Sequence, residues 1–266
     1  MGRPVLICLV GVTSLVSQLG AARAAPLDAD GVVSVAPRDA ARSAGRGVFL
    51  PLSQAASVDT QRAAATAFAG YDSARKAGVF EAATEVHLWG PFALRGGAVY
   101  ANENRTVRPS VGLRAQTLRQ ERHGVDGALG LFYRPEGLTE PEGELEGMVS
   151  LGRRAGNSYL LGSLVYGQDP EGRERDGEVR LAALHPMGAW ALAGFDSRVR
   201  LDLGSNRAVL TAHHEPTLDG LIGPLVTALA GPFALSIHGG ASLLRPSDGP
   251  RTLYGVFFMG GVGTTF

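Results

Sequence analysis

Apolar and polar residues alternate one by one along most of this chain from about residue 60 onward, in stretches of strand length separated by turn-forming residues. In residues 144–152, one face carries aliphatic side chains and the other polar ones: Leu145, Val149 and Leu151 against Glu144, Glu146 and Ser150. A helix would scatter these charges around its axis, whereas a strand places successive side chains on opposite faces. The pattern therefore predicts an all-β fold built from two-faced strands.

Two further segments place charge along one whole face of a strand. Residues 195–203 set Phe195, Val199, Leu201 and Leu203 against Asp196, Arg198, Arg200 and Asp202. Residues 107–120 set Val111, Leu113 and Ala115 against Arg108, Arg114 and Gln116. A face with this much charge does not suit an apolar core, so we expect it to meet water or other charges.

Long apolar segments beyond the N-terminal region are all interrupted by Gly, Pro or charged residues. A membrane helix needs roughly 20 consecutive, mostly apolar residues, and none of these segments supplies them. The chain contains 37 glycines, which favour turns and the close packing of small residues in a sheet. If the chain crosses a membrane, it must do so as a closed sheet in which every strand pairs with two neighbours.

The N-terminal region is typical of an export signal: Arg3, an apolar run over residues 5–16, and the small-residue end Ala22-Arg23-Ala24. We expect residues 1–24 to be a signal peptide cleaved after Ala24. Residues 25–58 are rich in Ala, Pro, Asp and Ser without a clear period, which predicts a periplasmic leader or linker. The folded domain is then residues 59–266. Cys8, the only cysteine, lies in the signal peptide, so no disulfide is expected afterwards.

The connections between strands alternate between short and long. The short ones lie near residues 90–91, 122–124, 155–157, 186–188 and 231–232, and the long ones near 101–106, 135–143, 168–176, 204–216 and 245–250. Bacterial membrane barrels join an even number of antiparallel strands by short periplasmic turns and longer external loops. An even count of about twelve requires residues 60–71 as the first strand, with a link at residues 72–78. The same stretch also fits an Ala-rich helix beginning after Asp59 and ending at Gly78.

The last segment adds a family resemblance. One face carries alternating apolar residues that end on a terminal aromatic residue: Tyr254, Val256, Phe258, Val262 and Phe266. This resembles the C-terminal assembly signal of Gram-negative outer-membrane β-barrel proteins, although Gly260 and Thr264 depart from the bulkier residues usual there. The resemblance implies a porin-like antiparallel transmembrane β-barrel in the bacterial outer membrane, with outer-membrane lipid and the barrel-assembly machinery as partners. It points to no particular member and brings no catalytic residues.

The charged faces would line the lumen of such a barrel. They contribute Glu81, Glu85, His87, Arg95, Arg108, Arg114, Asp126, Arg134, Glu178, Arg180, Asp196, Arg198, Arg200 and Asp202. Two interpretations fit this mixed-charge lumen: a closed ion-pair network that fills the interior, or a polar conduit without strong ion preference. Basic and acidic residues balance at 25 each and are scattered, so no nucleic-acid partner is expected.

No catalytic, cofactor-binding or metal-binding motif stands out, so we expect no cofactor. The best reading is a porin-like channel or a structural outer-membrane protein. One alternative is a soluble secreted or periplasmic barrel that encloses a small apolar ligand, which requires the two strand faces to exchange roles. Another is an outer-membrane esterase using Ser236 and His238, which share a strand face. The oligomeric state is left open.

Overall fold

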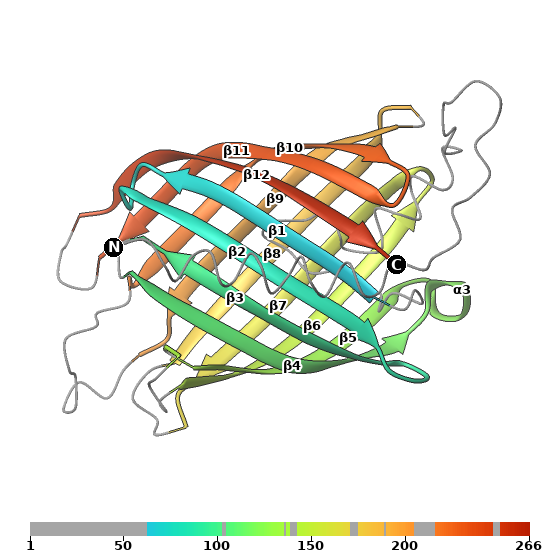
Figure 1. Cartoon of the computed structure of the whole chain (residues 1–266), viewed down its shortest axis with the longest axis horizontal. Coiled ribbons are helices and arrows are strands. Elements are labelled where there is room, and N and C mark those ends of the chain that lie inside the picture. Colours follow the sequence, from blue (N-terminus) through green and yellow to red (C-terminus); the bar gives the residue numbers. More distant parts are fainter. Residues whose placement is uncertain are drawn as a thin grey trace. The chain divides into compact units, whose positions relative to one another are not determined.

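The computed structural model describes residues 63–102, 105–135, 137–138, 143–170, 175–188, 190–204, 216–246 and 251–266. Antiparallel strands β1 to β12 form a closed barrel in which each strand pairs with its neighbours in sequence and β1 pairs with β12 (Figure 1). The strands are β1 (Ala63–Asp72), β2 (Ala77–His87), β3 (Phe92–Ala101), β4 (Thr106–Leu118), β5 (Asp126–Pro135), β6 (Gly143–Ala155), β7 (Ser158–Gln168), β8 (Arg175–Pro186), β9 (Ala191–Asp202), β10 (Leu218–Ala230), β11 (Phe233–Arg245) and β12 (Leu253–Thr265). The prediction of about twelve strands is confirmed, and the described part of the predicted first strand, residues 63–71, is a strand rather than a helix.

The outer face of the barrel is apolar, as the alternation predicts. Leu145, Val149 and Leu151 are 47%, 48% and 51% exposed, and similar residues are exposed on β4, β5, β7, β8 and β10 to β12: Leu113, Leu131, Leu164, Leu181, Val226, Ile237, Val256 and Phe258. An apolar surface this extensive is unfavourable in water but is what a bilayer requires. A soluble ligand-binding barrel would need the opposite arrangement, with these apolar residues facing inward and the charged residues facing water. The structure therefore does not support that alternative. No helix among the described residues is long and apolar enough to cross a membrane.

The two ends of the barrel differ in their connections. The short-turn end holds the first residue of β1, the last of β12 and the β2–β3, β6–β7, β8–β9 and β10–β11 turns. The β4–β5 connection is also at this end, but it is not the tight turn predicted at residues 122–124. It contains the single-turn helix α3 (Gln120–His123), which ends at Gly124 in the left-handed conformation, with φ 77° (Figure 1).

The opposite, long-loop end joins β1–β2, β3–β4 and the other odd-to-even pairs. Its first two links, residues 73–76 and 102–105, are as short as the turns at the other end, so the predicted alternation of length holds only for the four later links. The predicted signal peptide (residues 1–24) and the whole of the predicted leader (residues 25–58) lie outside the described residues.

The inner face is not polar throughout, which the sequence did not lead us to expect. Buried apolar residues of six strands form one cluster near the short-turn end, called here the apolar cluster: Ala64, Tyr159, Leu161, Ala182, Leu184, Leu192, Leu225 and Ala234. Aromatic rings also lie over inward-facing glycines. Phe68 covers Gly261 where β1 closes on β12, and Phe132 covers Gly112, positions where a Cβ would collide with the ring. Side chains thus fill a substantial part of the barrel.

Candidate functional site

A buried ion pair joins β2 and β4 on the inner face. The Nη1 atom of Arg114 donates to Oε2 of Glu85 at 2.7 Å, with the side chains 3% and 10% exposed. Arg95 of β3 stands opposite Glu85 in the register and interacts electrostatically with Glu85 and Glu81. Charges buried this deeply persist only where opposite charges offset the loss of hydration.

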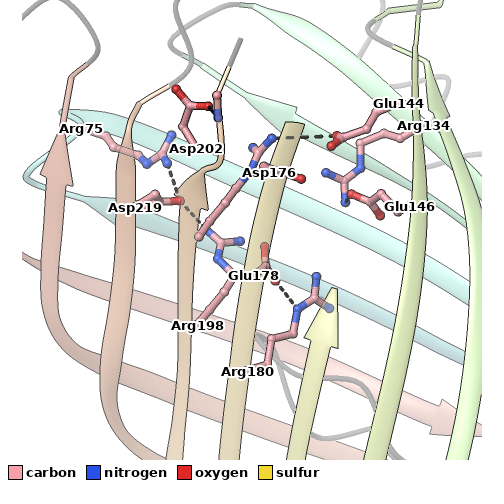
Figure 2. Close-up of polar contacts among 12 residues, drawn as sticks. Arg75, Arg134, Glu144, Glu146, Asp176, Glu178, Arg180, Arg198, Asp202 and Asp219 are labelled. Atoms are coloured by element: carbon pink, nitrogen blue, oxygen red, sulfur yellow. Dashed lines mark hydrogen bonds and ion pairs between the residues drawn. The ribbon is translucent and has the colours of Figure 1, made fainter. Parts of the chain in front are cut away.

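The opposite wall carries a longer series of pairs, drawn in Figure 2. Arg180 pairs with Glu178 on β8, and Nη2 of Arg198 lies 2.8 Å from Oδ2 of Asp219. The same Asp219 oxygen lies 2.5 Å from Nη2 of Arg75, so a single buried carboxylate holds two guanidinium groups. The two contacts of Asp219 link β9, β10 and the β1–β2 link, whereas the Arg180–Glu178 pair lies within β8.

The series of pairs continues toward β5 and β6. Nη2 of Arg134 lies 2.8 Å from Oε1 of Glu146, while Arg200 pairs with Asp176 and reaches within 3.9 Å of Glu144 (Figure 2). Strand β7 lies between β6 and β8 and contributes Gly167 here. A Cβ at Gly167 would collide with the carboxyl groups of Glu144 and Asp176. The glycine therefore leaves the space in which these two side chains approach.

Charged groups also act on one another across the lumen. Arg95 of β3 interacts electrostatically with Arg180 of β8, and Arg198 of β9 does so with Glu81 of β2. In the closed order of strands, β2 and β3 lie opposite β8 and β9. These inner-face charges on the two walls are called here the charged girdle: Glu81, Glu85, Arg95, Arg114, Glu178, Arg180 and Arg198.

The register places most of the sequence-predicted lumen residues on the inner face. Beyond the girdle these are His87, Arg108, Asp126, Arg134, Asp196 and Arg200. Asp202 is exposed at the end of β9, where its Oδ1 accepts a hydrogen bond from the Gly204 amide at 2.8 Å, so it belongs to the rim. Asp126 lies at the short-turn end, where its Oδ1 accepts from the Gln120 amide at 2.9 Å.

The sequence-derived list omitted the carboxylates that pair with the predicted arginines: Glu144, Glu146, Asp176 and Asp219. Glu144 and Glu146 had a usable signal, because both lie on the polar face that the alternation reveals. Nothing in the sequence indicated that Asp219 faces inward. Most of the residues that follow it on the inner face of β10, Leu221, Gly223 and Leu225, are as apolar as those on the outer face, so no alternation is visible.

Ser236 and His238, the residues of the esterase alternative, are buried on the inner face of β11. The Oγ of Ser236 lies 2.8 Å from Oγ1 of Thr227, and Nε2 of His238 lies 3.2 Å from the carbonyl oxygen of Gly223. The His238 ring packs edge-on against Phe257 with 4.7 Å between centroids. These contacts tie β11 to β10 and β12. No group of three or more metal-ligating side chains occurs within the described ranges.

The face that resembles an assembly signal points outward. Tyr254, Val256, Phe258 and Val262 are all exposed on the outer surface of β12, and Phe266 follows the strand. These residues are therefore positioned to meet lipid or another protein from outside the barrel.

The sequence matches no protein-family model and no curated protein. Among solved structures, one described as the NanC porin is 12% identical, with a TM-score of 0.54 over 76% of this chain and 100% of that chain. The KdgM porin is 8% identical, with a TM-score of 0.49 over 76% and 99%. At this identity the first likeness shows the fold alone, and the second, with its lower score, adds no argument. The chain folds as an outer-membrane β-barrel. Its closed sheet and apolar outer face place it in the bacterial outer membrane.

Proposed function

We propose that this barrel is a narrow porin-like channel through which small polar solutes cross the outer membrane. The charged girdle is the observation that carries the proposal. Groups of both signs from opposite walls act on one another across the lumen. Arg198 of the girdle remains 29% exposed, and Arg134 and Arg200, which lie outside it, remain 28% and 19% exposed. The partial exposure of these guanidinium side chains supports a polar path past the girdle.

The same residues suggest what the channel would discriminate. Positive and negative groups are interleaved on both walls, so an ion of either sign meets a compensating charge. Pores that select by side-chain charge use rings of one charge sign, and this interior does not have such a ring among its described residues. We therefore propose selection mainly by size, with little preference for cations over anions.

Single-channel recording of refolded protein in a planar bilayer tests the proposal. The wild type is expected to conduct, with a reversal potential in a salt gradient near that of an unselective pore. Changing Arg198 and Arg200 together to Glu replaces two positive charges with two negative ones within about a Debye length of passing ions. The variant is expected to favour cations, and the shift is expected to shrink as salt is raised.

A matched control variant, Arg245→Glu/Arg251→Glu, replaces two exposed arginines at the long-loop end. It is expected to change selectivity less than the Arg198/Arg200 variant does. A wild type that never conducts would favour the structural alternative, in which the ion pairs only fill the interior. A folded, conducting double variant with unchanged selectivity would remove Arg198 and Arg200 from the conduction path.

Three further expectations are part of the proposal. Residues 1–24 direct export and are removed. The outward residues of β12 and Phe266 are recognised by the barrel-assembly machinery. Ser236 and His238 serve packing rather than catalysis, because the contacts of each join it to a neighbouring strand.

A further inference from the structure

The β4–β5 connection is fixed onto the next turn of the barrel. Nε2 of Gln120 donates to the carbonyl oxygen of Arg154 at 2.8 Å, and the Arg154 amide donates to Oε1 of Gln120 at 2.7 Å. Asp126 accepts from the Gln120 amide at 2.9 Å. Reciprocal bonds of this kind hold α3 against the end of β6, so the side chains around them form a defined surface.

That surface is strongly basic. Its exposed cations are Arg119, Arg122 and Arg153, called here the basic patch, with His123 beside them, while Arg154 stands on the inner-face side of β6. Glu121 is the only acidic side chain of α3, and it pairs with Arg154 at 3.2 Å. Hydrogen bonding to its own backbone, and secondarily the charge of Arg154, lowers the pKa of Glu121, so at neutral pH it stays ionised. Arg154 offsets Glu121, and the buried Asp126 adds one further negative charge, so the three arginines of the patch still leave a net positive charge.

The rest of the short-turn end lacks such charge. The described residues of the turns at 88–91, 156–157, 187–190 and 231–232 include no Asp, Glu, Lys or Arg. Two of these turns instead carry the only tryptophans of the chain, Trp89 and Trp190, which are 68% and 65% exposed. Exposed tryptophans at strand ends are typical of the layer where acyl chains give way to headgroups.

Arg153 of the basic patch lies at that same depth. On the outer face of β6, Arg153 follows the lipid-facing Leu151 by two residues, a rise of roughly 7 Å along the strand. A long arginine side chain at this position keeps its stem against the apolar surface and its guanidinium among the headgroups. Guanidinium groups bind phosphate through paired N–H donors.

We propose that the basic patch binds anionic phospholipids of the leaflet that meets the short turns, through their phosphate groups. Charge complementarity and continuity with the apolar outer face both favour a lipid as the occupant. In outer-membrane barrels the short turns face the periplasm, so the lipids concerned are those of the inner leaflet. The proposal concerns the outside of the barrel and does not depend on conduction.

The two tryptophans allow a direct test, because both report on the short-turn end. Refolded protein in phosphatidylcholine vesicles receives a trace of pyrene-labelled phosphatidylglycerol or pyrene-labelled phosphatidylcholine, and energy transfer from tryptophan measures each lipid near that end. At low ionic strength the wild type is expected to enrich the anionic lipid at least about twofold over the zwitterionic one. In the Arg122→Gln/Arg153→Gln variant the two lipids are expected to be equally represented.

The control variant, Arg245→Gln/Arg251→Gln, removes two exposed arginines from the long-loop end and is expected to retain the wild-type enrichment. All three proteins must show the heat-modifiable gel migration of a folded barrel. An enrichment that persists in the Arg122/Arg153 variant, one that both variants lose equally, or none in the wild type would each overturn the proposal.

Discussion

The charged girdle and the apolar cluster occupy the inner face of the same strands, yet their chemistry is opposite. On β8, Arg180 belongs to the girdle and Leu184 to the cluster, and on β9 Arg198 and Leu192 divide in the same way. The outer face shows no such change, because lipid surrounds it at every depth of the hydrocarbon layer. Inside the barrel, the side chains across the lumen decide which residues are tolerated, so the inner face changes from charged to apolar over four residues of β8 and six of β9.

The largest effect that separates the two regions is expected from Leu225→Ala in the apolar cluster. Leu225 is 1% exposed, and truncating it leaves a cavity among packed neighbours at a cost of about 2 to 5 kcal/mol. Leu235 on the neighbouring strand is 57% exposed on the outer face, where lipid can fill the space, so Leu235→Ala is expected to cost far less. Urea unfolding in detergent or lipid measures both.

Equal destabilisation by Leu225→Ala and Leu235→Ala would show that the cluster is not packed, and the contrast between the two interior regions would be lost.

A smaller effect is expected where the girdle loses one member of a pair. Glu85→Gln leaves the guanidinium of Arg114 buried beside a neutral amide, which we expect to cost about 1 to 3 kcal/mol of unfolding free energy. The double variant Glu85→Gln/Arg114→Gln removes both charges and should recover part of this loss. Strictly additive losses in this double-mutant cycle would mean that the pair contributes no coupling.

The smallest effect is expected at the boundary between the regions. Ser163 neighbours Leu161 of the apolar cluster along β7 and stands opposite Arg180 of the girdle. Its Oγ lies 2.8 Å from Oγ of Ser150. We expect Ser163→Ala to cost about 1 kcal/mol, since it leaves one buried hydroxyl without this partner. If Ser163→Ala left the unfolding midpoint unchanged, the boundary between the two regions would have to lie elsewhere.

The outer face could be predicted from the sequence because lipid imposes one rule on it. Leu145, Val149 and Leu151 alternate with polar residues, and the period alone decides which way they point. The inner face follows no single rule. Strand β7 is apolar on both sides near Leu161, so alternation cannot reveal that this part of the interior is filled.

The partners of the arginines were beyond sequence reasoning for a different reason. Arg200 lies on β9 and Glu144 on β6, and their approach depends on barrel curvature and on the missing side chain at Gly167. Pairing between adjacent strands can be estimated from register, whereas contact across intervening strands requires the closed structure. The helix α3 was missed because four residues between two strands give no detectable period.

The seam between β1 and β12 has a consequence for how this protein reaches its folded state. All the other ladders of the sheet join strands that are consecutive in the sequence, whereas the β1–β12 ladder joins the first strand to the last. Its loop-closure entropy is the largest of all the ladders, so it is expected to form late and to set the pace of folding. Until it forms, the sheet has two unpaired edges that can join other chains. Shielding those edges is then a kinetic requirement, and losing either β1 or β12 would leave an open, aggregation-prone sheet rather than a smaller barrel.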